Sequence, residues 1–178
     1  MPIVIDIAFY AAFALFATAT VTSFLYLRGD RPNMLDMTQR AISIAGGLLF
    51  VTICMRWIYF GRIPLTTMVD IVNLLLFMST VIVAILVRKD MLRPLTCYYA
   101  PPLAALSLMN VALGFNKLHQ APKELNDVFL AVHVGLAFLA YALFLIASLT
   151  SAVYIVQARR LKSPLNTART AKLPPLEH

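Results

Sequence analysis

The sequence predicts an all-α integral membrane protein, a bundle of five transmembrane helices, and three observations support this fold class. Its 178 residues are 61% hydrophobic and only 13% charged, a composition that is unusual for a soluble domain. Long apolar stretches follow one another along the chain, with only short polar connectors between them. Because a backbone in lipid must satisfy its own hydrogen bonds, such stretches form helices and not open strands.

Five stretches reach the roughly 20 apolar residues that a transmembrane helix needs: Ile3–Leu27, Ala41–Phe60, Met68–Val87, Leu95–Phe115 and Val128–Val156. The first begins without a basic residue and is too long for a signal peptide, so we predict a retained helix. The proline pair Pro101-Pro102 predicts a break in the fourth. Residues 1–157 should therefore form the transmembrane domain, and residues 158–178 a basic cytoplasmic tail or linker.

The distribution of lysine and arginine predicts the orientation. Eleven basic residues fall on one side of the predicted bundle: Arg28, Arg31, Arg40, Arg88, Lys89, Arg93, Arg159, Arg160, Lys162, Arg169 and Lys172. Only Arg62, Lys117 and Lys123 fall on the other. The positive-inside rule then places the amino terminus outside and the tail in the cytoplasm of a multi-pass inner (plasma) membrane protein. Since topology accounts for the net charge of +7, we predict no nucleic-acid partner.

The predicted outer turn after the second helix is rich in aromatic residues. Trp57 and Tyr59 could anchor the bilayer interface while Arg56 extends its charge to the headgroups. Gly61 and Pro64 predict a tight hairpin, however, and its aromatic walls would suit a flat apolar ligand. The sequence leaves both interpretations open.

Asp70 lies just inside the third apolar stretch, with Asn73 on the same helical face. A carboxylate at that depth is costly unless it has a partner, and such residues are candidates for function. Arg56 or Arg62, at the facing end of the second helix, is the expected partner. Asp70 could instead only cap its own helix, because the helix dipole favours an anion there.

His133 is the only histidine inside an apolar stretch and lies near its predicted outer end. Asp127 is a suitable N-cap, and Phe129 precedes the histidine by one helical turn. The imidazole could ligate a metal ion or haem, or form an interhelical hydrogen bond. His119, in the predicted outer connector, could be a second axial ligand, a haem-propionate contact or a solvated side chain. Cys54 and Cys97 have no CxxC spacing and are expected to be buried core residues.

Two motifs carry a family resemblance. The run Arg56-Trp57-Ile58…Gly61-Arg62-Ile63-Pro64-Leu65…Asp70 resembles the RWI…GxxPLxxxxE pattern of cytochrome c assembly membrane proteins of the CcsA/HemX type, with Asp70 in place of glutamate. The run His133–Phe144 resembles their HVxxxxxxYA helix, and the basic exit Tyr154–Lys162 is similar as well. These family members continue into a tryptophan-rich segment and a second ligand histidine. This chain contains a single tryptophan. It therefore resembles an amino-terminal portion of such a protein, a split gene product, or a HemX-like member of the family without the tryptophan-rich segment.

The resemblance implies a haem-binding membrane component of cytochrome c biogenesis. In that family the residue matched by His133 is an axial ligand of haem b, which is presented on the non-cytoplasmic face to the CxxCH thiols of apocytochrome c. The chain would then be part of a haem-lyase (synthase) complex with a CcsB/ResB-like membrane subunit, and not catalytic alone. We expect haem to lie against Phe129 and the Trp57–Pro64 hairpin, with Arg56, Arg62 or Lys117 near its propionates.

The alternative is a HemX-like membrane scaffold or regulator of haem biosynthesis. Its active surface would be the Arg28–Arg40 connector and the tail, and not His133. A small transporter is a third interpretation, but the proline break in the fourth stretch has no counterpart in a second half of the chain.

Overall fold

The computed structural model describes residues 2–29, 32–61, 65, 67–88, 90–114 and 128–161, and all regular structure in these ranges is helical. The elements in chain order are α1 (Pro2–Gly29), α2 (Pro32–Phe60), α3 (Met68–Leu86), the 3-10 helix η1 (Asp90–Leu95), α4 (Thr96–Ala112) and α5 (Val128–Leu161). The predicted all-α class is therefore confirmed for this part of the chain.

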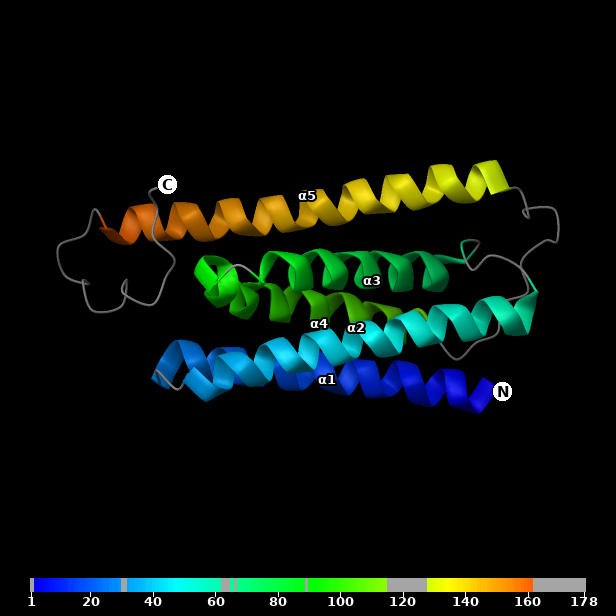
Figure 1. Ribbon diagram of the computed structural model, residues 1–178, viewed down its shortest axis with the longest axis horizontal. Coiled ribbons are helices and arrows are strands. Elements are labelled where there is room, and N and C mark those ends of the chain that lie inside the picture. Colours follow the sequence, from blue (N-terminus) through cyan, green and yellow to red (C-terminus); the bar gives the residue numbers. More distant parts are fainter. Residues whose placement is uncertain are drawn as a thin grey trace.

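The α-helices alternate in direction and lie in three layers (Figure 1). α1 and α2 pack along each other on one side, α3 and α4 occupy the middle, and α5 runs along the opposite side. We call the end where α1, α3 and α5 begin the amino-terminal end, and the end that holds η1 the opposite end. α5 contacts mainly α3 and, to a smaller extent, α4.

Four of the described helices, α1, α2, α3 and α5, are long and apolar enough to cross a membrane. The helix of the fourth predicted stretch is shorter than expected, because it covers only Thr96–Ala112. At about 1.5 Å per residue these 17 residues span roughly 26 Å, slightly less than a hydrocarbon core of about 30 Å. Pro101 and Pro102 lie inside α4 without ending it.

The apolar pattern located the helices but not all their ends. α2 begins at Pro32, nine residues before the predicted apolar start at Ala41, so most of the expected connector is helical. Proline is well suited to a first helical position, because it has no N–H that needs a partner there. α5 likewise continues to Leu161, beyond the predicted end at Val156.

The hydrophobic core lies between α1, α2, α3 and α4. Among its buried residues are Phe9, Phe16, Leu49, Leu76 and Tyr99, and only Ile146 comes from α5. A close approach between α2 and α3 tightens this core: a Cβ atom at Gly46 would lie 2.7 Å from Cγ2 of Thr80. Interhelical hydrogen bonds are few among the described residues, as expected where small residues and apolar packing hold helices together in lipid.

Candidate functional site

A buried ion pair joins α2 to α3 near the amino-terminal end of the bundle. Nε of Arg56 donates to Oδ1 of Asp70 over 2.8 Å, and the two side chains are only 3% and 4% exposed. The guanidinium of Arg56 also lies over the ring of Phe60, 5.4 Å from its centroid. The predicted partnership of Asp70 with a basic residue of the second helix is confirmed. Arg56 is thus held inside the bundle and does not extend to the headgroups.

The local sequence explains why Asp70 points toward α2. Thr67 is the N-cap of α3, and its Oγ1 accepts a hydrogen bond of 3.2 Å from the backbone N–H of Asp70. The same hydroxyl donates to Oδ2 of Asp70 over 2.8 Å. This is a variant of the capping box, in which the cap and the third helical residue support each other. Asp70 therefore has both predicted roles: it helps to cap α3 and it pairs with an arginine.

The end of α2 is shaped by a glycine. Gly61 has a φ of 61°, a conformation that other residues rarely adopt. Its N–H donates to the carbonyl of Trp57 over 3.0 Å, as in the helix ending that places one residue in the left-handed region. The turn follows Arg56 by a little more than one helical turn, so it ends α2 close to the ion pair.

Two buried asparagines lie in the same half of the bundle. The amide groups of Asn73 and Asn110 are fully buried, and neither has a hydrogen-bond partner in the part of the chain that the structure describes. Counted along their helices at roughly 1.5 Å per residue, Asn73 lies about 20 Å from the end of α3 and Asn110 about 21 Å from the start of α4. The two amides are therefore at similar depth on neighbouring antiparallel helices. Asn110 was not among the predicted site residues, although a lone amide inside an apolar stretch is visible in the sequence.

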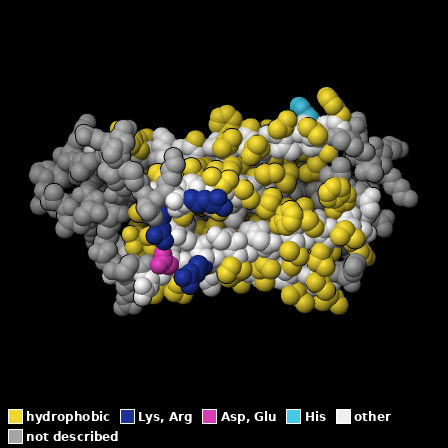
Figure 2. Space-filling view, in the orientation of Figure 1, with side chains coloured by type: hydrophobic (Ala, Val, Ile, Leu, Met, Phe, Trp, Pro, Cys, Tyr) yellow, Lys and Arg dark blue, Asp and Glu magenta, His cyan; other side chains and the backbone are white. Residues whose placement is uncertain are grey.

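His133 lies on an exposed face of α5, near its amino-terminal end. Phe129, four residues earlier, is 82% exposed. In Figure 2 the cyan histidine stands at the edge of the molecule over this end of α5. Only 11% of the most apolar stretch of α5 is buried, against 44% for α3. The helix that carries His133 is thus the least covered of the four membrane-length helices.

The described helices do not bring His133 and Trp57 together. Trp57 is more than half exposed at the end of α2, and α5 packs on α3 and α4 and not to any large extent on α2. A flat ligand on His133 would consequently lie on the outer surface of α5. Within the described ranges no three histidine, cysteine or acidic side chains gather to hold a metal ion.

Three of the predicted site residues, Arg62, Pro64 and His119, lie outside the described residues, as does Lys117. Of the remaining four, Asp70 is placed in the buried ion pair, whereas Trp57, Phe129 and His133 are on exposed surfaces of two helices. The buried pair and the exposed histidine are therefore two separate features of the amino-terminal end.

Comparison of the chain with protein-family models, with curated proteins and with solved structures gives no match. The similarity to cytochrome c assembly proteins accordingly rests on the two sequence motifs alone.

Proposed function

We propose that the chain is a haem-binding membrane component of cytochrome c biogenesis, which presents haem b on the non-cytoplasmic face for attachment to apocytochrome c. The observation that carries the proposal is the exposed imidazole of His133, on a membrane-length helix whose apolar surface is largely uncovered. An imidazole in an apolar stretch lacks water as a partner, and coordination of iron is one of the few roles that use it.

In this proposal His133 supplies one axial nitrogen from the surface of α5. Phe129, one turn away on the same exposed face, provides an apolar ring beside the ligand. Bound haem would supply an iron centre whose reactivity is tuned by its axial ligand and by the polarity around it. Because this face of α5 is uncovered, a second membrane subunit of the CcsB/ResB type would cover the side of the haem that points away from α5. The covalent chemistry then belongs to the apocytochrome thiols and to the assembled complex.

The ion pair excludes Arg56 as a contact of the haem propionates. Arg56 is engaged by the carboxylate of Asp70 inside the bundle, so it is not available to a ligand on the surface of α5. Arg62 and Lys117 remain candidates from the sequence. The Arg56–Asp70 pair instead supports the site indirectly, because it fixes α2 against α3, on which α5 packs.

The proposed orientation follows the positive-inside rule. The amino-terminal end, with Arg56, Asp70 and His133, would face outward. The opposite end, where Arg88 and Arg93 lie, would be on the cytoplasmic side of the inner membrane.

The test is a Soret spectrum of the purified chain in detergent, before and after reconstitution with haemin. We expect a haem band for the wild type and its loss in His133→Ala. Val132→Ala is the matched control, because Val132 is exposed beside His133 but has no ligand atom. A band that survives in His133→Ala would refute ligation by this residue. Absence of any band in the wild type would reject the haem proposal and favour the HemX-like regulator, whose surface is Arg28–Arg40 and the tail.

A further inference from the structure

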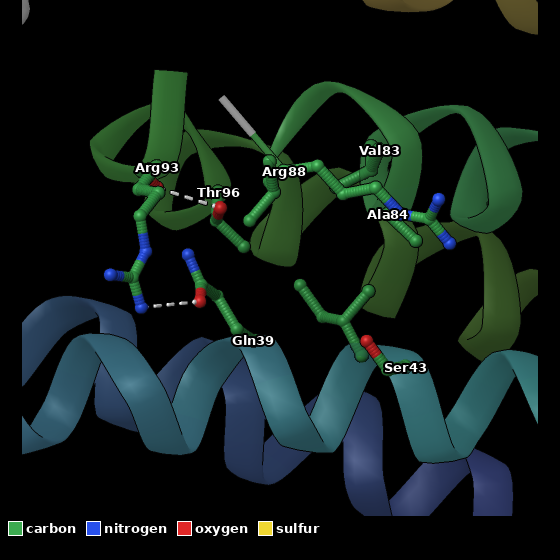
Figure 3. A pocket seen from close by; sticks show the side chains of 9 residues that line it. Gln39, Ser43, Val83, Ala84, Arg88, Arg93 and Thr96 are labelled. Atoms are coloured by element: carbon green, nitrogen blue, oxygen red, sulfur yellow. Dashed lines mark hydrogen bonds between the residues drawn. The ribbon is translucent and has the colours of Figure 1, made fainter. Parts of the chain in front are cut away.

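A cavity of about 320 Å³ lies at the opposite end of the bundle, between α2, the end of α3 and the start of α4. Its size is at the lower end of the roughly 300–1,000 Å³ of ligand pockets, so it suits a headgroup better than a large cofactor. Figure 3 shows the side chains that define its two sides: Gln39, Ser43, Val83, Ala84, Arg88, Arg93 and Thr96.

A buried amide nitrogen of the cavity has no acceptor among the described residues. Nη2 of Arg93 donates to Oδ1 of Asp36 over 2.7 Å and to Oε1 of Gln39 over 3.1 Å. The carbonyl of Gln39 is therefore used, but its Nε2 is buried and has no hydrogen-bond partner among the described residues. Figure 3 shows this nitrogen directed into the space between α2 and the start of α4. A buried amide N–H without an acceptor is costly, so a bound acceptor at this position would stabilise the structure.

The charge of the cavity favours an anion. The carboxylate of Asp36 balances Arg93. Arg88 also lines the cavity, and its exposed side chain forms no ion pair or hydrogen bond with any residue that the structure describes. In Figure 3 its guanidinium extends along α3 toward Ala84. Figure 2 shows dark blue basic side chains beside magenta carboxylate atoms at this end of an otherwise largely hydrophobic face.

The rest of the lining is apolar. Ile42 of α2 and three residues of the α3 end, Val83, Ala84 and Val87, form this part of the wall. A site for a free anion would need no hydrocarbon surface next to its donors. A phospholipid has both parts, since its phosphate is followed by glycerol and acyl chains. The cavity also lies where a membrane interface is expected, near the last residues of the membrane-length helix α3 and the first residues of α4.

We propose that this cavity binds the phosphate of an anionic phospholipid. Nε2 of Gln39 donates a hydrogen bond to a phosphate oxygen, and the exposed guanidinium of Arg88 contributes positive charge to the same cavity. The apolar wall around Val83 and Ala84 contacts the glycerol backbone and the first methylenes of an acyl chain. Basic pockets between transmembrane helices are a known form of lipid recognition, and this site is independent of haem binding by His133.

Native mass spectrometry of the full chain, with phosphatidylglycerol or phosphatidylcholine added to the micelles, tests the proposal. We expect the wild type to retain one phosphatidylglycerol in preference to phosphatidylcholine. Arg88→Gln should weaken phosphatidylglycerol binding roughly fivefold, which corresponds to about 1 kcal/mol for one arginine at a lipid surface. Arg40→Gln is the matched control, because Arg40 is exposed on α2 next to Gln39 but does not line the cavity. It should change binding by less than about twofold, because Arg40 is outside the cavity lining, whereas Arg88, also exposed, is part of it.

Two further measurements test the apolar wall and distinguish a phospholipid from a free phosphate ion. Ala84→Phe places a ring in the apolar part of the cavity without changing its charge. This variant should no longer retain phosphatidylglycerol, although Arg88 is still present. Excess inorganic phosphate should not displace the lipid, because it lacks the hydrocarbon part. The proposal is overturned if Arg88→Gln binds like the wild type, if Arg40→Gln weakens binding equally, or if inorganic phosphate competes fully. Size-exclusion chromatography must show that each variant is folded and monodisperse.

Discussion

Arg56 on α2 and Asp70 on α3 form a buried ion pair with an Nε–Oδ1 distance of 2.8 Å. Oδ2 of the same carboxylate accepts a hydrogen bond from Thr67, so both of its oxygens are hydrogen-bonded. Removal of one partner of such a pair leaves an uncompensated charge in a low-dielectric interior. The free-energy cost of leaving this charge unpaired is much larger than the net contribution of the intact pair to stability.

The first prediction follows from this asymmetry. Asp70→Leu and Arg56→Leu should each destabilise the bundle by about 3–5 kcal/mol, whereas the double variant should recover much of that loss. Asp70→Asn is a smaller change that also leaves Arg56 uncompensated. The stability of this variant should lie between those of the wild type and Asp70→Leu. Circular dichroism during denaturation by sodium dodecyl sulfate measures the helix content. A loss in the double variant equal to the sum of the two single losses would contradict an energetic coupling between the two residues.

The second prediction concerns the close approach of α2 to α3. Gly46→Ala should destabilise the bundle by about 1–3 kcal/mol, because its Cβ would overlap the methyl group of Thr80. Thr80 cannot rotate freely, since its hydroxyl donates to the carbonyl of Leu76 over 2.7 Å. Gly47→Ala is the control, because a Cβ there meets nothing within 4 Å. If Thr80→Ala fails to rescue Gly46→Ala, another contact is responsible for the loss.

The third prediction concerns the buried amide of Asn110. Replacement by leucine, which is similar in size and needs no hydrogen bond, should leave the thermal stability in detergent unchanged or raised by about 1 kcal/mol. Asn73→Leu should behave in the same way. A loss of several degrees in the melting temperature of either variant would mean that the amide has a partner such as a bound water molecule.

The fourth prediction concerns orientation. Green fluorescent protein fused after His178 should fluoresce in cells, because the positive-inside bias places the tail in the cytoplasm, where this reporter folds. Alkaline phosphatase at the same position should be inactive. Active phosphatase and a dark fluorescent reporter would reverse the proposed topology and place the cavity with Arg88 on the outer face.

The sequence was sufficient for those features that depend on residue type and order. Long apolar stretches predicted the helices, and charges near two adjoining helix ends predicted the pairing of Asp70. It was not sufficient for features that depend on how each helix is rotated about its axis. α5 is apolar on nearly all sides, so periodicity could not tell which face would pack on α3 or that His133 would lie on the uncovered face.

The cavity at the opposite end was missed for a related reason. Gln39 and Arg93 are hydrogen-bonded although 54 positions separate them. Neither residue stood out from a set of basic and polar residues that topology already explained. Only the packed helices show that Arg93 is balanced by Asp36, and that Arg88 and a buried amide line the same space.

The small share of the core that α5 contributes has a consequence for the assembly of the bundle. Of the clustered buried apolar residues in the described chain, Ile146 alone belongs to α5, and Tyr99 with Thr150 adds one hydroxyl–hydroxyl contact of 2.7 Å between α4 and α5. Helices α1 to α4 thus share most of the core without α5. We therefore expect α5 to pack onto helices that already contact one another, with most of its own apolar surface left uncovered.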